Sequence, residues 1–169
     1  MQSFISASSG QTKKIAADLA KKIVKEGKSA LRLRSGQAVV LALQGDLGAG
    51  KTTFTQGLAK ALGVKERVLS PTFVLLKKFK VQSEKLKVAV KSSKLNRFQY
   101  FYHFDCYRIQ KPEEILSLGW QEIVKNPKNI VAIEWPEKIK KLLPKNTIWL
   151  KFEYKDKNKR SIKFMSGQK

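Results

Sequence analysis

The chain has 169 residues, of which 42% are hydrophobic and 28% charged, so it can bury a core, and general disorder is excluded. Its 35 basic residues outnumber 13 acidic ones, and the formal charge of +22 predicts a polyanionic partner or a strongly solvated surface. A single cysteine excludes an internal disulfide framework. Because the chain lacks a signal-peptide pattern and a long apolar run, we expect a cytoplasmic protein without a membrane span.

The N-terminal third of the chain alternates helical and strand-like patterns. Apolar residues at helical spacing predict a helix over residues 12–25, with Gly27 as the signal that ends it. A nearly continuous apolar run at 37–44 is typical of a buried central strand. Residues 51–63 again present one apolar face, and Gly63 predicts the end of this second helix.

The middle of the chain is rich in aromatic and branched residues, which predict strands at 72–81 and 95–105. Between them, residues 77–97 contain eight basic residues and one acid. We interpret this segment as a basic, hairpin-like insert within a single domain that spans residues 1–169.

The last third of the chain predicts two further helices and a closing hairpin. A proline followed by acids opens a helix at 111–124. A short apolar strand then leads into a second helix across 129–143. Alternating residues at 146–155, followed after a short turn by residues 160–165, predict an antiparallel pair with one face on the core.

A phosphate-binding pattern lies between the first predicted strand and the second predicted helix. Residues 45–52 match G-x-x-x-x-G-K-[ST] without a mismatch. Glycines let backbone amides approach phosphate oxygens, and the positive end of the following helix faces the same oxygens. We expect Lys51 to reach the outer phosphates and the Thr52 hydroxyl to bind Mg²⁺. The predicted site for ATP and Mg²⁺ therefore contains Gly45, Asp46, Leu47, Gly48, Ala49, Gly50, Lys51 and Thr52.

Two acids stand at the ends of predicted strands, Asp105 and Glu134. A P-loop enzyme needs a carboxylate at such a place to hold or orient hydrated Mg²⁺. The pattern does not rank the two acids: one could coordinate the metal while the other positions water. For each acid alone, a solvated residue that caps a loop is an equally good interpretation.

Four other residues near these motifs have simple structural interpretations. Thr72 follows a proline, and the pattern alone favours an ordinary turn over a phosphate-sensing loop. His103, the only histidine, is interpreted as a packed or hydrogen-bonded structural residue, and Cys106 as a small apolar filler. Trp135 directly follows Glu134, so its ring belongs either to the core or to the wall of a nucleotide pocket.

Several motifs together resemble the TsaE family, also called YjeE. They are the P-loop stretch 45–63, "SPTF" at 70–73, "YHFDCYR" at 102–108, "PEE" followed by "LG" within 112–119, and "IEWPEK" at 133–138. Their order and rough spacing are those of the family over about residues 10 to 155. The chain departs from the family pattern in its longer, more basic segment 77–97 and in a slightly expanded stretch at 28–37.

The resemblance implies a small bacterial P-loop ATPase of the α/β class, with three layers and a mixed central sheet flanked by helices. Such proteins serve the synthesis of threonylcarbamoyladenosine in tRNA. They bind a complex of TsaD and TsaB and hydrolyse ATP to reset it between turnovers. Carried over to this sequence, the resemblance adds Thr53 to the P-loop and Thr72 as a switch-like residue. It makes Asp105 a metal ligand, Glu134 a second essential acid close to the metal, and Trp135 a pocket residue.

Two other classes of function remain open at this stage. A small-molecule kinase would need an acceptor site and an arginine-bearing lid, and Arg160 is the only arginine after Arg108. A nucleic-acid-binding P-loop protein would agree with the charge and could contact tRNA, but the sequence contains no aromatic RNA-binding signature. Phosphate release without an acceptor, stimulated by TsaD and TsaB, would distinguish the ATPase from both.

Overall fold

Four parallel strands form the centre of the molecule in the computed structural model, which describes residues 2–30, 36–71, 74–82, 98–157 and 159–165. Their order in the sheet is β6-β2-β5-β4. β2 and β5 are nearly continuous apolar runs, as strands covered on both faces require. The four strands are β2 (Val39–Gln44), β4 (Tyr100–Asp105), β5 (Asn129–Glu134) and β6 (Ile148–Asp156).

Antiparallel strands extend this centre on both sides. β3 (Leu76–Lys80) pairs with β4, while β7 (Lys159–Met165) pairs with β6. β1 (Ser3–Ser6), which the sequence patterns do not predict, lies outside β7 and brings the sheet to seven strands within the described residues. The mixed sheet confirms the predicted α/β class, and the β6–β7 pair confirms the predicted closing hairpin.

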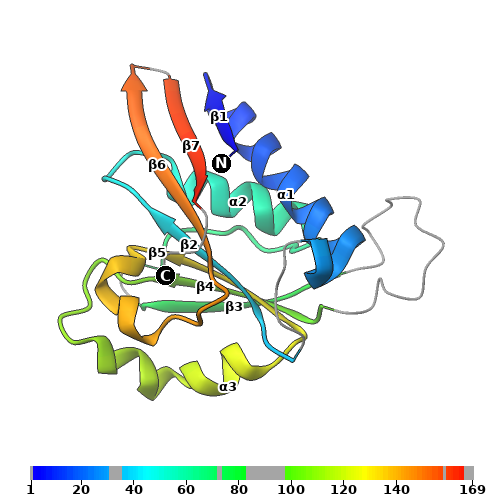
Figure 1. The fold of residues 1–169 in the computed structure, drawn as a ribbon, viewed down its shortest axis with the longest axis vertical. Helices are drawn as coiled ribbons and strands as arrows, with labels where there is room; N and C mark the ends of the chain where they lie inside the picture. The colour runs from blue at the N-terminus through cyan, green and yellow to red at the C-terminus, as the bar shows by residue number, and fades with distance from the viewer. Residues whose placement is uncertain (1, 31–35, 72–73, 83–97, 158, 166–169) are drawn as a thin grey trace.

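Helices cover both faces of the sheet, so the molecule has three layers (Figure 1). α1 (Ser9–Ala30) and α2 (Lys51–Ala61) pack on one face. The other face is covered by α3 (Trp120–Lys125) and by two 3₁₀ helices, η3 (Pro112–Leu118) and η4 (Pro136–Leu142). A separate apolar cluster fills each interface. No helix in the described part of the chain is long and apolar enough to cross a membrane.

Two predicted helix boundaries are wrong. α1 continues through Gly27 to Ala30, because one glycine inside a helix costs only about 1 kcal/mol and a long packed face offsets it. The helix predicted at 111–124 is divided into η3 and α3 by Gly119, whose φ of 75° lies in the left-handed region. By contrast, Gly63 follows the end of α2 with a φ of 77°, as predicted.

Most of the basic insert lies outside the described residues, which exclude 83–97. The described start of the segment belongs to the sheet, because Lys77, Lys78 and Lys80 are part of β3. At this edge, the Lys78 ammonium lies 4.0 Å from the centre of the Tyr100 ring.

Candidate functional site

The loop between β2 and α2 depends on glycine backbones. Gly45, Gly48 and Gly50 have φ values of 151°, 78° and 99°, which side-chain-bearing residues rarely adopt. A Cβ atom on Gly45 would also overlap the carbonyl oxygen of Phe152 on β6. Gly50 is the N-cap of α2, so the loop delivers the chain directly into the helix N-terminus. This is the strand–loop–helix arrangement that the phosphate-binding pattern requires.

Lys51 is buried at the first position of α2, with 4% of its surface exposed. Its ammonium donates to the carbonyl oxygens of Gly45, at 2.6 Å, and Asp46, at 2.8 Å. It also lies 4.1 Å from the centre of the Trp135 ring. Burial lowers the pKa of Lys51 from its ordinary value of 10.5, and the nearby carboxylate of Glu134 is the largest opposing charge. The lysine is therefore held at the mouth of the loop by fixed dipoles and a ring face.

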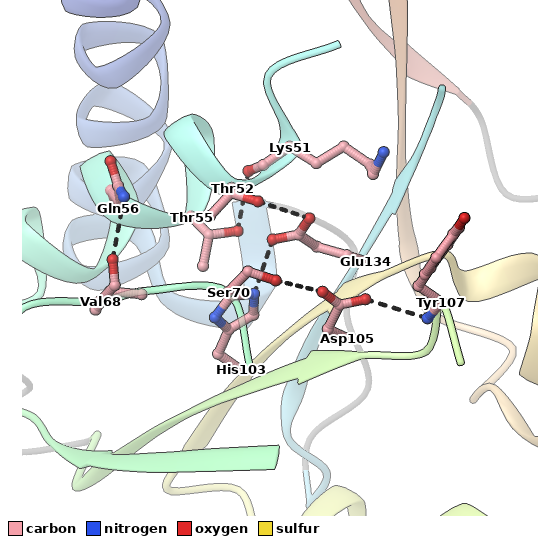
Figure 2. Close-up of polar contacts among 10 residues, drawn as sticks. All are labelled: Lys51, Thr52, Thr55, Gln56, Val68, Ser70, His103, Asp105, Tyr107 and Glu134. Carbon is pink, nitrogen blue, oxygen red and sulfur yellow. Dashed lines mark hydrogen bonds and ion pairs between the residues drawn. The ribbon is translucent and has the colours of Figure 1, made fainter. Parts of the chain in front are cut away.

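Glu134 ends β5 beside the start of α2, and both of its oxygens accept hydrogen bonds (Figure 2). The Thr52 hydroxyl donates to Oε2 at 2.9 Å. On the other side, His103 Nε2 lies 2.9 Å from Oε1. Only 3% of Glu134 is exposed, so its orientation is set by protein groups.

Asp105 ends β4 and pairs in register with Glu134 on β5. The Ser70 hydroxyl donates to Asp105 Oδ2, and the backbone amide of Tyr107 donates to Oδ1 at 3.1 Å. Figure 2 shows Asp105 directed toward Ser70, next to the Glu134 carboxylate. Parallel strands bring both acids to one edge of the sheet, which explains why the strand-end pattern found them.

Trp135 has the conformation of a strained turn residue. Its φ of 58° and ψ of 49° are left-handed, which is unfavourable for a bulky side chain. The turn places its ring against Lys51 and 5.1 Å from the ring of Tyr107. Trp135 is half-buried: it borders the site and also packs against the apolar cluster beneath η3 and η4, so its position agrees with both interpretations.

A cavity of about 340 Å³ unites these elements. It is bordered by the P-loop and α2 on one side and by the ends of β4 and β5 on the other. Its lining residues are Leu47, Gly48, Gly50, Lys51, Thr52, Thr53, Ser70, Asp105, Tyr107, Glu134 and Trp135. Most of the predicted site residues thus meet in one place. Gly45 and Asp46 border a neighbouring cavity instead, Ala49 packs into the core, and Thr72 lies outside the described residues.

Three residues at the site were not predicted to belong to it. Ser70 and Tyr107 lie within the quoted motifs, so their motif membership was a usable signal. Arg160 had no local signal. It comes from β7, and its Nε donates to the carbonyl oxygen of Gly48 at 3.4 Å. The structure thus places the Arg160 guanidinium beside the P-loop. The sequence did not predict this contact because Arg160 and Gly48 are far apart along the chain.

The oxygen donors of the site fit Mg²⁺. They are one hydroxyl, from Thr52, and two buried carboxylates, from Asp105 and Glu134. Among the described residues, no group of three or more histidine, cysteine, aspartate or glutamate side chains could hold a metal ion by itself. Mg²⁺ does not need such a cage, because it prefers oxygen ligands and takes several of them from water and substrate phosphates.

Cys106 follows Asp105 but faces away from the site. It is fully buried in the apolar cluster beneath η3 and η4. Burial raises the pKa of its thiol to about 12, so the reactive thiolate is scarce at neutral pH. The interpretation of Cys106 as an apolar filler agrees with this environment.

Comparisons with known proteins agree on one family. The family model described as "Threonylcarbamoyl adenosine biosynthesis protein TsaE" matches residues 6–162. The chain is 34% identical to the tRNA threonylcarbamoyladenosine biosynthesis protein TsaE of Haemophilus influenzae, over 75% of this chain and 70% of that protein. It is 36% identical to the protein of the same name from Rickettsia conorii, over 77% of this chain and 65% of that protein.

A solved structure has a similar fold. The crystal structure of YdiB from Bacillus subtilis superposes with a TM-score of 0.64 at 24% identity. The superposition covers 99% of this chain and 86% of that one.

Proposed function

Because this chain belongs to the TsaE family of threonylcarbamoyladenosine biosynthesis proteins, we propose that it is a Mg²⁺-dependent ATPase of that tRNA modification pathway. The observation that carries the proposal is the convergence of Lys51, Thr52 and two buried carboxylates on one cavity at the P-loop. A cavity with this donor set suits a triphosphate and its metal better than an uncharged ligand.

The P-loop binds the phosphates of ATP in this proposal. The backbone amides at the start of α2 can donate hydrogen bonds to the phosphate oxygens. The helix dipole adds positive potential at the same place. Lys51 supplies the positive charge, and its carbonyl partners fix where that charge lies. Trp135 and Tyr107 border the cavity at the ends of β4 and β5.

Thr52, Asp105 and Glu134 are the residues that would hold Mg²⁺, directly or through its water ligands. The bound metal would neutralise charge that develops on the phosphate oxygens during hydrolysis. Glu134 accepts a hydrogen bond from Thr52, whereas Asp105 accepts one from Ser70, which lies between α2 and β3. In this proposal Glu134 accepts a proton from the attacking water, and Asp105 binds the hydrated metal.

The partners in this proposal are TsaD and TsaB, and ATP hydrolysis resets their complex between turnovers in the cytoplasm. Family membership supports this role, and the exposed side chain of Leu47 at the loop tip provides a contact for a partner at the cavity mouth. The net charge of +22 also supports a contact with tRNA, to which the segment 77–97 would contribute.

Phosphate release from ATP, with no acceptor present, tests the proposal. The expected result is slow Mg²⁺-dependent release that rises on addition of TsaD and TsaB and is lost in Lys51→Ala. Lys60→Ala is the matched control, since Lys60 lies exposed in the last turn of the same helix. No release under any of these conditions would contradict the ATPase. Phosphate transfer to an added small molecule, in preference to water, would favour a kinase instead.

A further inference from the structure

His103 is a fully buried histidine whose hydrogen-bond partner is the Glu134 carboxylate. The ring has no exposed surface, and its Nε2 atom lies 2.9 Å from Glu134 Oε1. Its other nitrogen, Nδ1, is buried with no hydrogen-bond partner among the described residues. A carboxylate oxygen accepts hydrogen bonds, so the form of the ring that suits this contact carries a proton on Nε2. In that form His103 donates to Glu134.

The sheet register explains how His103 reaches an acid on the next strand. On β4, His103 and Asp105 point to the face that α2 covers, because side chains two residues apart share a face. His103 is directly opposite Ala132 on β5, and Glu134 lies two residues further along. The small side chain of Ala132 leaves the diagonal open, so the imidazole meets the carboxylate from below (Figure 2).

The two residues that donate hydrogen bonds to Glu134 differ in whether they have another role at the site. Thr52 donates to Oε2, but its hydroxyl oxygen is also the group that the P-loop pattern assigns to Mg²⁺. His103 donates to Oε1 from a rigid central strand and has no such second task. The hydrogen bond from His103 is therefore kept when Mg²⁺ binds, whereas the hydrogen bond from Thr52 can change.

We propose that His103 is a positioning residue that holds the Glu134 carboxylate in the orientation needed for ATP hydrolysis. This inference rests on the proposed ATPase function and concerns the same site. His103 does not border the cavity, so it acts through Glu134 and not on the nucleotide. Its loss should consequently lower kcat while the KM for ATP stays nearly constant.

Three substitutions separate the hydrogen bond from the packing. In His103→Gln, the side-chain amide nitrogen lies near the position of Nε2 and can still donate to Glu134. His103→Asn is shorter by one carbon and cannot reach, and His103→Leu has no donor. Phe101→Leu is the packing control, because Phe101 is fully buried on the same face of the same strand. Melting temperatures establish that each variant is folded before its kinetics are compared.

The expected result is a fall in kcat of about tenfold to a hundredfold in His103→Asn and His103→Leu, with KM for ATP changed by about twofold or less. His103→Gln and Phe101→Leu should keep most of the parental kcat. Equal losses in the glutamine and asparagine variants would overturn the proposal. So would a kcat in His103→Leu that matches the packing control.

A spectroscopic measurement tests the hydrogen bond between His103 and Glu134 without measuring ATP turnover. His103 is the only histidine, so nitrogen NMR of the imidazole in the ¹⁵N-labelled chain reports on this ring alone. We expect a ring protonated at Nε2, whose Nε2–H signal shifts in Glu134→Gln. A ring without a proton on Nε2, or a signal indifferent to Glu134→Gln, would overturn the contact. If the contact is found but the parent releases no phosphate with TsaD and TsaB, the ATPase function fails, and the role of His103 in turnover fails with it.

Discussion

Two glutamates on strands of the same sheet contrast with each other. Glu134 at the end of β5 is buried, and its oxygens accept hydrogen bonds from a threonine and a histidine. Glu153 on β6 is partly exposed and forms ion pairs with three lysines. The ammonium groups of Lys163, Lys151 and Lys155 lie 2.9, 3.0 and 3.3 Å from its oxygens.

The contrast separates a carboxylate that is available for chemistry from one that is neutralised. Three lysines lower the pKa of Glu153 to about 2, and their ammonium groups balance the charge of its carboxylate. Glu134 instead contacts Thr52 and His103, which set the orientation of its carboxylate. A buried acid of this kind can still attract Mg²⁺ or a water proton, which Glu153 cannot do as well. The three predictions below test this contrast.

The largest effect is expected at the cation of the site. Replacing Lys51 by alanine should lower ATP affinity or turnover by about a hundredfold or more, because a charge-assisted contact with phosphate is lost. Equilibrium binding of a fluorescent ATP analogue and phosphate release measure the two quantities. Lys51 is buried, so the carbonyls of Gly45 and Asp46 lose a donor, and thermal unfolding must show that the variant is folded. Unchanged binding in a folded variant would contradict the assignment of the P-loop.

Substitutions of the two strand-end acids should affect different quantities: kcat for Glu134 and the Mg²⁺ dependence of ATP binding for Asp105. Glu134→Gln should lower kcat by about a hundredfold and affect ATP affinity less, because a general base is lost while phosphate contacts remain. Asp105→Asn should instead raise the Mg²⁺ concentration needed for half-maximal ATP binding by about tenfold. Mg²⁺ titrations of binding and turnover measure both, and Glu122→Gln on α3, an exposed acid, is the matched control. Titration curves that coincide with the parent for both variants would make these acids buried structural residues without a role in catalysis or metal binding.

The smallest effect is expected at Glu153. Its folded pKa is lowered from 4.5 to about 2, so its ion pairs stabilise the fold above pH 4.5, and this contribution is lost as the pH falls toward 2. Glu153→Gln should lower the melting temperature at pH 7 by about 2 °C or less, because ion pairs near the surface contribute little. ATP turnover should not change.

Melting curves of parent and Glu153→Gln between pH 7 and pH 2 test this sign. The two curves should converge at the acid end, where both side chains are uncharged. A difference that grows as the pH falls would mean that the lysines do not stabilise the ionised glutamate.

The local parts of the site could be predicted from the sequence alone. The P-loop is one continuous segment, and its glycines, Lys51 and Thr52 have their places because neighbouring residues share a turn and a helix start. Asp105 and Glu134 were found for a similar reason, since each ends an apolar strand and parallel strands end at one edge. Helix ends were less predictable, as α1 shows, because packing against the sheet can offset a glycine.

Contacts between distant segments were decided only by the tertiary structure. The patterns could not rank Asp105 and Glu134, because the choice depends on strand order: β5 lies next to β2, and β4 lies one strand further away. That order places Glu134 against Thr52, and the register brings His103 to its other oxygen. Arg160 reaches the P-loop across 112 residues of sequence only because β7 pairs with β6. Local spacing determines which residues share a face or a turn, whereas strand pairing over long separations determines which of those faces meet.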